Sequence, residues 1–213
     1  MRISFLRALV VLHRTFSFHP AGQRVHILGR FLTCPFLRTL HHVQAGGRVL
    51  DIGAGHGTFA RLAIEAGARE VVAVEPDLRK VLGGFRQPGI RFVAAFDDAV
   101  GGTFDLITIF DVLYRMPISE WDSLISRTHS RLSTGGRLLI KEIDPGLRMK
   151  FAWNRAQERL WDKLFGLTLG TEFTYETREQ FRTRLARAGF TSVAVEEIDA
   201  GYPHGHVSYV AER

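Results

Sequence analysis

The stretch RVLDIGAGHGTFAR at residues 48–61 decides how the chain is expected to fold. It begins as a continuous apolar run, turns at three alternating glycines and continues with apolar residues at helical spacing. A second apolar run, VVAVEPD at 71–77, follows and closes on acidic residues. Strand, glycine turn, helix and strand in this order are typical of a unit whose two strands are parallel and joined by a right-handed crossover.

Similar apolar runs recur along the whole chain. They lie at 48–53, 71–75, 90–95, 105–111 and 137–141, and helical spacing separates most of them. The runs are nearly continuously apolar, as expected of strands that helices cover on both faces. Two further runs at 192–200 and 206–213 are joined by the loop GYPHG, which is too short for a helical crossover. The sequence therefore predicts an α/β fold, a mostly parallel sheet that ends in an antiparallel hairpin.

Length and cysteine content limit the number of domains and exclude two kinds of stabilising site. A chain of 213 residues suffices for one domain with a full core, and the single cysteine, Cys34, excludes an internal disulfide and a multi-cysteine metal cluster. Near the N-terminus, Arg7, His13 and Arg14 interrupt the apolar stretch, which argues against a signal peptide. No window has the length and apolar character of a membrane span. We therefore expect a cytoplasmic protein.

Charge is concentrated at one end of the chain. Residues 1–48 hold seven arginines and no Asp or Glu, whereas the remainder carries 21 basic and 22 acidic side chains. The N-terminal segment therefore accounts for the whole net charge of +6. Such a segment suits an anionic membrane surface, an anionic group on a substrate or nucleic acid, or it is simply a solvated face. Because no nucleic-acid-binding motif is present, no nucleic-acid partner is predicted.

The glycines predict a ligand site at the carboxyl edge of the sheet, where glycine allows positive φ and close approach to a ligand. Glu75 ends the second apolar run 20 residues after Gly55, a position suited to binding both hydroxyls of a ribose. The spacing G-x-G-x-G differs from the G-x-G-x-x-G of dinucleotide sites, and Asp51 within the strand would repel a pyrophosphate. A nucleoside with positive charge, such as S-adenosylmethionine (SAM), is therefore predicted.

Four motifs in order, VLDIGAGHGTFA, VVAVEPD, FDLITIFDVLYRMP and LSTGGRLLIKE, resemble those of the class I SAM-dependent methyltransferase family. The resemblance covers roughly residues 45–145. It implies a Rossmann-like sheet of seven mostly parallel strands with helices on both faces, and the predicted helix and hairpin at 177–213 agree with that. It also implies SAM as cofactor and no metal. The residues it assigns to the cofactor site are Asp51, Gly53, Ala54, Gly55, Gly57, Glu75, Pro76, Phe96, Asp97, Phe110 and Asp111.

The resemblance implies a role for each of these residues. The glycine loop would lie beneath the methionine and ribose, with Asp51 at the amino acid end and Glu75 on the ribose. Pro76, Phe96 and Asp97 would enclose the adenine, although Asp97 is equally well a helix N-cap. Phe110 and Asp111 would lie beside the methyl group.

The acceptor is less defined than the cofactor. Amino-methyltransferases that act on nucleobases or glutamine typically carry an Asn/Asp-Pro-Pro-aromatic tetrapeptide where this chain has DVLY at 111–114, so a small or lipid-like acceptor is favoured. A basic N-terminal lid at 1–44 and a helical insertion at about 145–176 within the methyltransferase domain, 45–213, are predicted to form its pocket. The aromatic residues of the insertion equally suit a core. The two segments fit an apolar acceptor with an acidic head, such as an acyl, polyketide or prenyl-type molecule.

Transfer needs a general base only where the acceptor must lose a proton. His204 and Tyr114, predicted to lie on the cofactor face, are the candidates, and a loop histidine without a catalytic role is the alternative for His204. Two other functions stay open at this point. One is a non-catalytic scaffold subunit with the same fold, and the other is an NAD-linked oxidoreductase, against which the glycine spacing argues.

Overall fold

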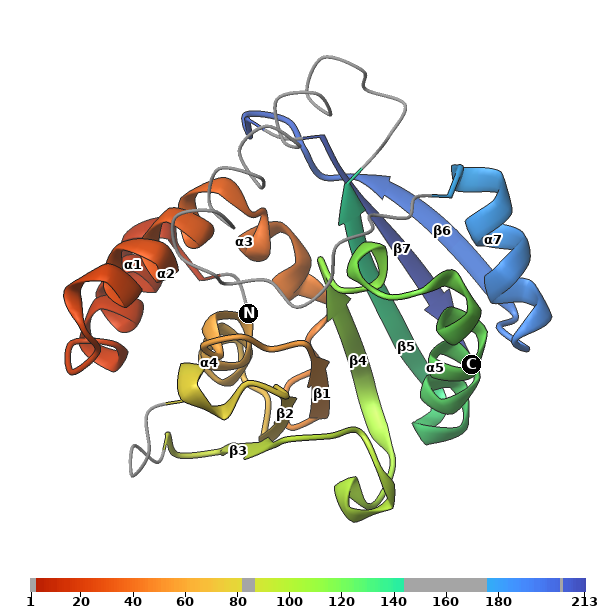
Figure 1. Cartoon of the computed structure of the whole chain (residues 1–213), viewed down its shortest axis with the longest axis horizontal. Coiled ribbons are helices and arrows are strands. Elements are labelled where there is room, and N and C mark those ends of the chain that lie inside the picture. Colours follow the sequence, from red (N-terminus) through yellow and green to blue (C-terminus); the bar gives the residue numbers. More distant parts are fainter. Residues whose placement is uncertain (1–2, 82–86, 144–175, 204) are drawn as a thin grey trace.

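A seven-stranded sheet forms the centre of the computed structural model, which describes residues 3–81, 87–143, 176–203 and 205–213 (Figure 1). The spatial order is β3-β2-β1-β4-β5-β7-β6. The strands are β1 Arg48–Ile52, β2 Glu70–Val74, β3 Ile90–Val93, β4 Phe104–Phe110, β5 Leu132–Ile143, β6 Ser192–Glu197 and β7 His206–Glu212. Neighbouring strands from β3 to β5 are parallel, and β7 is antiparallel to both β5 and β6. The predicted fold class and its antiparallel hairpin are confirmed.

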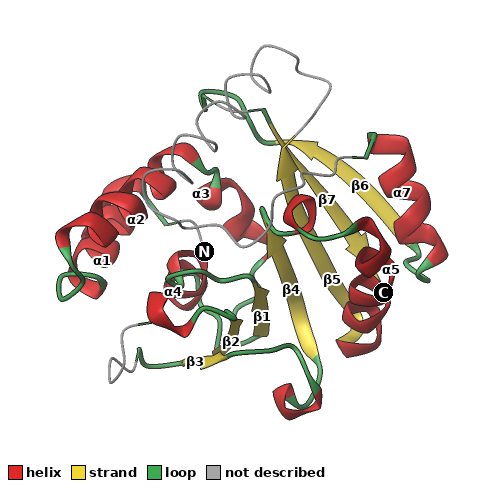
Figure 2. Cartoon of the chain, viewed as in Figure 1, coloured by secondary structure: helices red, strands yellow, loops and turns green. Residues whose placement is uncertain are grey.

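Helices cover both faces of the sheet (Figure 2). The α-helices are α1 Phe5–Thr15, α2 Ala21–Thr33, α3 Phe36–Thr39, α4 Thr58–Glu65, α5 Ile118–Arg131 and α7 Arg178–Arg187. Short 3-10 turns follow several elements: η1 Leu40–His42, η2 Leu78–Lys80, η3 Asp98–Val100 and η4 Leu113–Arg115. In the described ranges, no helix is both long enough and apolar enough to cross a membrane.

Alternate residues of the central strands enter two separate cores, because successive side chains of a strand point to opposite faces. Val49 of β1 packs with Leu12 of α1, Phe31 of α2 and Phe59 of α4. The next residue, Leu50, belongs to the other core, together with α5 and α7. The N-terminal helices therefore bury their inner side chains in the same core as α4 and the sheet. The predicted insertion at 145–176 lies, except for its last residue, outside the described residues.

Two of the loop glycines are required by close packing. Gly53 has φ +75°, and a Cβ there would lie 2.2 Å from Cγ2 of Val112. Gly57, at the N-terminus of α4, has φ +82°, and a Cβ there would lie 2.6 Å from Cζ of Phe92. Gly55 has φ +57° and open space in the same direction. The glycine loop is thus tightly packed at Gly53 and Gly57, whereas space remains next to Gly55.

We expect Gly53→Ala to lower the free energy of unfolding by about 2–4 kcal/mol, since alanine would both strain the backbone and collide with Val112. Urea unfolding followed by circular dichroism measures the change. Gly29→Ala in α2 is the control, because nothing lies within 4 Å of its would-be Cβ. Helix propensity predicts that it stabilises by about 0.5–1 kcal/mol. Equal stability of Gly53→Ala and the natural chain would contradict the close contact.

Candidate functional site

Asp51 provides a buried, half-satisfied carboxylate at the base of the glycine loop. It lies in β1 and is buried, and its Oδ1 accepts a hydrogen bond of 2.8 Å from Oγ1 of Thr108 on β4. Its Oδ2 is buried and has no hydrogen-bond partner among the described residues. Burial raises the pKa of Asp51 to about 6, against the opposing effect of the Thr108 hydroxyl. At neutral pH this carboxylate is therefore mostly ionised, with one oxygen left to bind a donor.

Glu75 ties the second strand to the glycine loop. Its Oε2 accepts a hydrogen bond of 2.8 Å from the backbone N–H of Gly55. Its Oε1 accepts from the N–H of Asp77 at 2.9 Å and pairs with Nζ of Lys80 at 3.1 Å. A carboxylate has about four acceptor positions, so these contacts leave capacity for a further donor. Pro76, the next residue, is exposed.

Three other assigned residues divide between core and surface. Phe96 is buried in the core that contains α5, with the Arg127 guanidinium 4.5 Å from its ring centroid. Asp97 is exposed, and its carbonyl accepts from the N–H of Val100 in η3. Phe110 packs against Phe59, with ring centroids 4.8 Å apart. The positions agree with the carboxyl edge of the sheet, and the roles of these residues toward a cofactor stay predictions.

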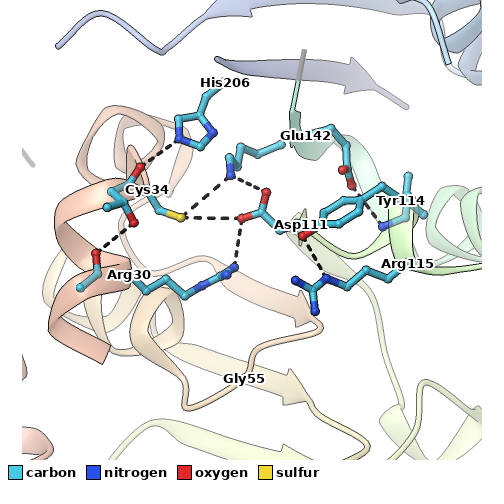
Figure 3. A network of polar contacts seen from close by, with 12 residues as sticks. Arg30, Cys34, Gly55, Asp111, Tyr114, Arg115, Glu142 and His206 are labelled. Atoms are coloured by element: carbon cyan, nitrogen blue, oxygen red, sulfur yellow. Dashed lines mark hydrogen bonds and ion pairs between the residues drawn. The ribbon is translucent and has the colours of Figure 1, made fainter. Parts of the chain in front are cut away.

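Asp111 is the centre of a buried polar network that the sequence did not reveal (Figure 3). It follows β4 with φ 58°, the one positive φ of a non-glycine residue in the described ranges. Its Oδ1 lies 2.5 Å from Nζ of Lys141 on β5, and its Oδ2 lies 3.1 Å from Nη2 of Arg30 on α2. The thiol of Cys34 adds a contact of 3.7 Å to Oδ2. Three segments far apart in the chain therefore meet at one carboxylate.

Electrostatics keep Asp111 ionised and a neighbouring carboxyl neutral. Burial alone would raise the pKa of Asp111, but Lys141 and Arg30 outweigh it and hold the pKa below its ordinary value. Burial, reinforced by the charge of Asp111, raises the pKa of Glu142 to about 8. The Oε1 of Glu142 accepts from the N–H of Leu113 at 3.1 Å, whereas its Oε2 has no partner in the described part of the chain. Glu142 is therefore mostly protonated at neutral pH.

Of the two predicted base candidates, the structure describes Tyr114, which lies near this network (Figure 3). Tyr114, in η4, is buried, and its hydroxyl accepts a hydrogen bond of 2.9 Å from Nε of Arg115. The charge of Arg30 also interacts with Tyr114. His204 lies outside the described residues. Its neighbour His206 is buried and donates from Nε2 to the carbonyl of Thr33 at 2.9 Å, so it joins the hairpin to the end of α2.

Helix α2 forms one wall of the site. His26 and Arg30 are four residues apart, and this spacing places them on the same face of the helix. The His26 ring centroid lies 5.5 Å from that of His56 in the glycine loop, while Arg30 contacts Asp111. Burial lowers the pKa of His56 to about 3, so its ring is neutral. The spacing of His26 and Arg30 was visible in the sequence, but their partners are set only by the fold.

We expect Lys141→Met to lower the free energy of unfolding by about 3–5 kcal/mol, because it leaves Asp111 buried beside a single, partly exposed cation. The double variant Asp111→Asn/Lys141→Met removes both charges and is expected to recover part of the loss. Thermal and urea unfolding of the two variants measure this difference. If the double variant were less stable than Lys141→Met, the loss would have another cause than the unpaired carboxylate.

Known proteins resemble this chain in sequence. A family model described as a methyltransferase domain matches residues 25–195. The demethylspheroidene O-methyltransferase of Rhodobacter capsulatus is 31% identical over 162 residues, which are 69% of this chain and 37% of that protein. The ribosomal protein L11 methyltransferase of Ralstonia nicotianae is 32% identical over 114 residues, which are 48% of this chain and 34% of that protein. The chain thus spans just over a third of the length of these curated relatives.

A solved structure covers nearly all of the chain. The 1,6-didemethyltoxoflavin-N1-methyltransferase of Burkholderia thailandensis, with 1,6-didemethyltoxoflavin and S-adenosylhomocysteine bound, aligns with a TM-score of 0.62 at 22% identity. The alignment covers 99% of this chain and 91% of that one. At this level of identity the likeness establishes the fold alone, and that fold is the one of SAM-dependent methyltransferases.

Proposed function

Because this chain belongs to the methyltransferase domain family, we propose that it transfers the methyl group of SAM to a small, apolar acceptor with an acidic head. The observation that carries SAM as the methyl donor is the buried Oδ2 of Asp51, which has no hydrogen-bond partner among the described residues and lies beneath a glycine loop that is open at Gly55. The relatives named above support methyl transfer in general, and two of them act on small molecules by the names they bear.

The residues at the carboxyl edge fit SAM. A buried oxygen without a partner costs free energy unless a ligand supplies a donor, and the ammonium group of SAM is such a donor for Asp51. Open space at Gly55 leaves room for a ligand against the backbone, and Glu75 keeps acceptor capacity for ribose hydroxyls. When bound, SAM would supply the methyl group of its sulfonium, and in-line displacement by the acceptor would break the S–CH3 bond and release S-adenosylhomocysteine. The chain itself contributes positioning and the exclusion of water.

We expect Asp51→Asn to weaken SAM binding at least tenfold, because the amide lacks the charge that attracts the ammonium group. Isothermal titration with SAM and S-adenosylhomocysteine measures the affinity. Asp98→Asn, an exposed acidic position paired with Arg131, is the matched control and should bind as the natural chain does. If neither compound binds the natural chain, the non-catalytic scaffold function takes the place of this proposal, and binding of NAD alone would indicate a dinucleotide site.

The same titration has a predicted pH dependence. Since the pKa of Asp51 is about 6, its carboxylate gains charge between pH 5 and 7. SAM affinity is therefore expected to rise over that interval and to level off above it. In Asp51→Asn this component of the pH dependence should be absent.

Tyr114 and His204 are proposed to assist an acceptor that must lose a proton. Either Tyr114→Phe or His204→Ala is expected to slow single-turnover methyl transfer at least tenfold with SAM affinity unchanged, because the methyl donor and its site remain intact. His13→Ala, on the exposed side of α1, is the histidine control. Transfer rates within a few-fold of the natural chain in both variants would remove the proposal of a base at these two positions.

A further inference from the structure

Apolar side chains are exposed on the N-terminal helices. Eight large apolar residues in the described part of the chain are strongly exposed, and six of them belong to residues 5–32. Phe18, in the connection between α1 and α2, is 80% exposed, Leu6 on α1 is 73% exposed and Val25 on α2 is 66% exposed. The other three are Phe5, Val10 and Leu32. A cluster of this kind on a folded domain marks a surface that contacts something apolar.

These residues are carried by two helices that contact each other, α1 and α2, and by the connection between them. Leu6 and Val10 are one turn apart on α1, and Val25 and Leu32 are two turns apart on α2. The ring of Phe5 stacks on Phe31 with centroids 5.4 Å apart, which joins the start of α1 to the end of α2. The two helices lie side by side at the end of the molecule opposite α7 (Figure 1). We call the six exposed residues together the α1–α2 surface.

The charged side chains that α1 and α2 themselves carry are all basic. Arg7 and Arg14 on α1 and Arg24 on α2 are exposed, and residues 1–48 contain no Asp or Glu. Arg7 also pairs with Glu65 of α4 at 3.2 Å, and its side chain is still 58% exposed. Contact between two copies through this surface would bring arginines against arginines. An anionic lipid headgroup region, by contrast, offers both an apolar layer and opposite charge.

We propose that the α1–α2 surface docks on an anionic lipid bilayer, with the apolar side chains inserted at the headgroup boundary and the arginines against lipid phosphates. The role of this docking rests on the proposed function, since a bilayer would be the source of the apolar acceptor. While α2 presents Val25 and Leu32 outward, it turns His26 and Arg30 toward the glycine loop and Asp111. A docked α2 would therefore hold the bilayer one helix away from the site, where an apolar acceptor is concentrated close to it.

Vesicle flotation of the full chain tests the docking. Binding to vesicles of equal parts phosphatidylglycerol and phosphatidylcholine is expected to exceed binding to pure phosphatidylcholine at least tenfold. It is also expected to fall several-fold when salt is raised from 0.1 to 0.5 M. Leu6→Glu/Val25→Glu should lose at least nine-tenths of the bound fraction, and Arg14→Gln/Arg24→Gln should lose more than half. Ile118→Glu, at the exposed start of α5, and Arg182→Gln on α7 are matched controls that should bind as the natural chain does.

Titration of each variant with SAM separates the docking from the methyltransferase proposal. All four variants are expected to keep the SAM affinity of the natural chain, because none of the changed side chains contacts the site. Equal binding to both vesicle types, or full binding by Leu6→Glu/Val25→Glu, would overturn the docking while leaving methyl transfer intact. A dimer in size-exclusion chromatography that Leu6→Glu/Val25→Glu abolishes, together with no vesicle binding, would assign the surface to a second copy and also overturn it.

Discussion

The carboxylate of Asp111 is the constraint on which the site depends. A buried charge is tolerated only where other charges and donors compensate for lost hydration. Lys141 supplies one cation from β5 and Arg30 supplies the other from α2. Since α2 belongs to the N-terminal segment, the ion pair fixes where that segment meets the sheet. The wall that α2 forms over the glycine loop follows from this contact.

Such a network contributes to positioning more than to stability. The Coulomb attraction within a buried pair is largely offset by the cost of removing both ions from water, so apolar side chains of similar volume often serve stability as well. Apolar side chains, however, would not specify which residue contacts which, because their contacts have no preferred direction. Because Lys141 and Arg30 approach different oxygens of Asp111, the relative position of β4, β5 and α2 is specified by direction as well as by contact.

The fold was predictable from the sequence because its signals are local. Continuous apolar runs marked the strands, and the short loop before β7 marked the antiparallel hairpin. Some features needed the structure. β5 begins at Leu132 rather than near 137, since Leu132 already pairs with Phe104 in β4. Asp51 and Glu75 could be found from their places beside glycines, whereas Arg30 and Lys141 could not, because a pairing across 81 or 30 residues leaves no periodic trace.

The charges around the site indicate that the Asp51 carboxylate favours a cationic ligand. Glu75 has Lys80, Asp111 has Lys141 and Arg30, and Glu142 is held neutral by burial. Asp51 is ionised at neutral pH and forms no ion pair with any residue the structure describes; Thr108 satisfies one oxygen and nothing described satisfies the other. A neutral nucleoside would leave that charge uncompensated, and a pyrophosphate would add to it. A ligand with an ammonium group would compensate it directly, and on this argument Asp51, more than the glycines beside it, is the residue proposed to select the cofactor.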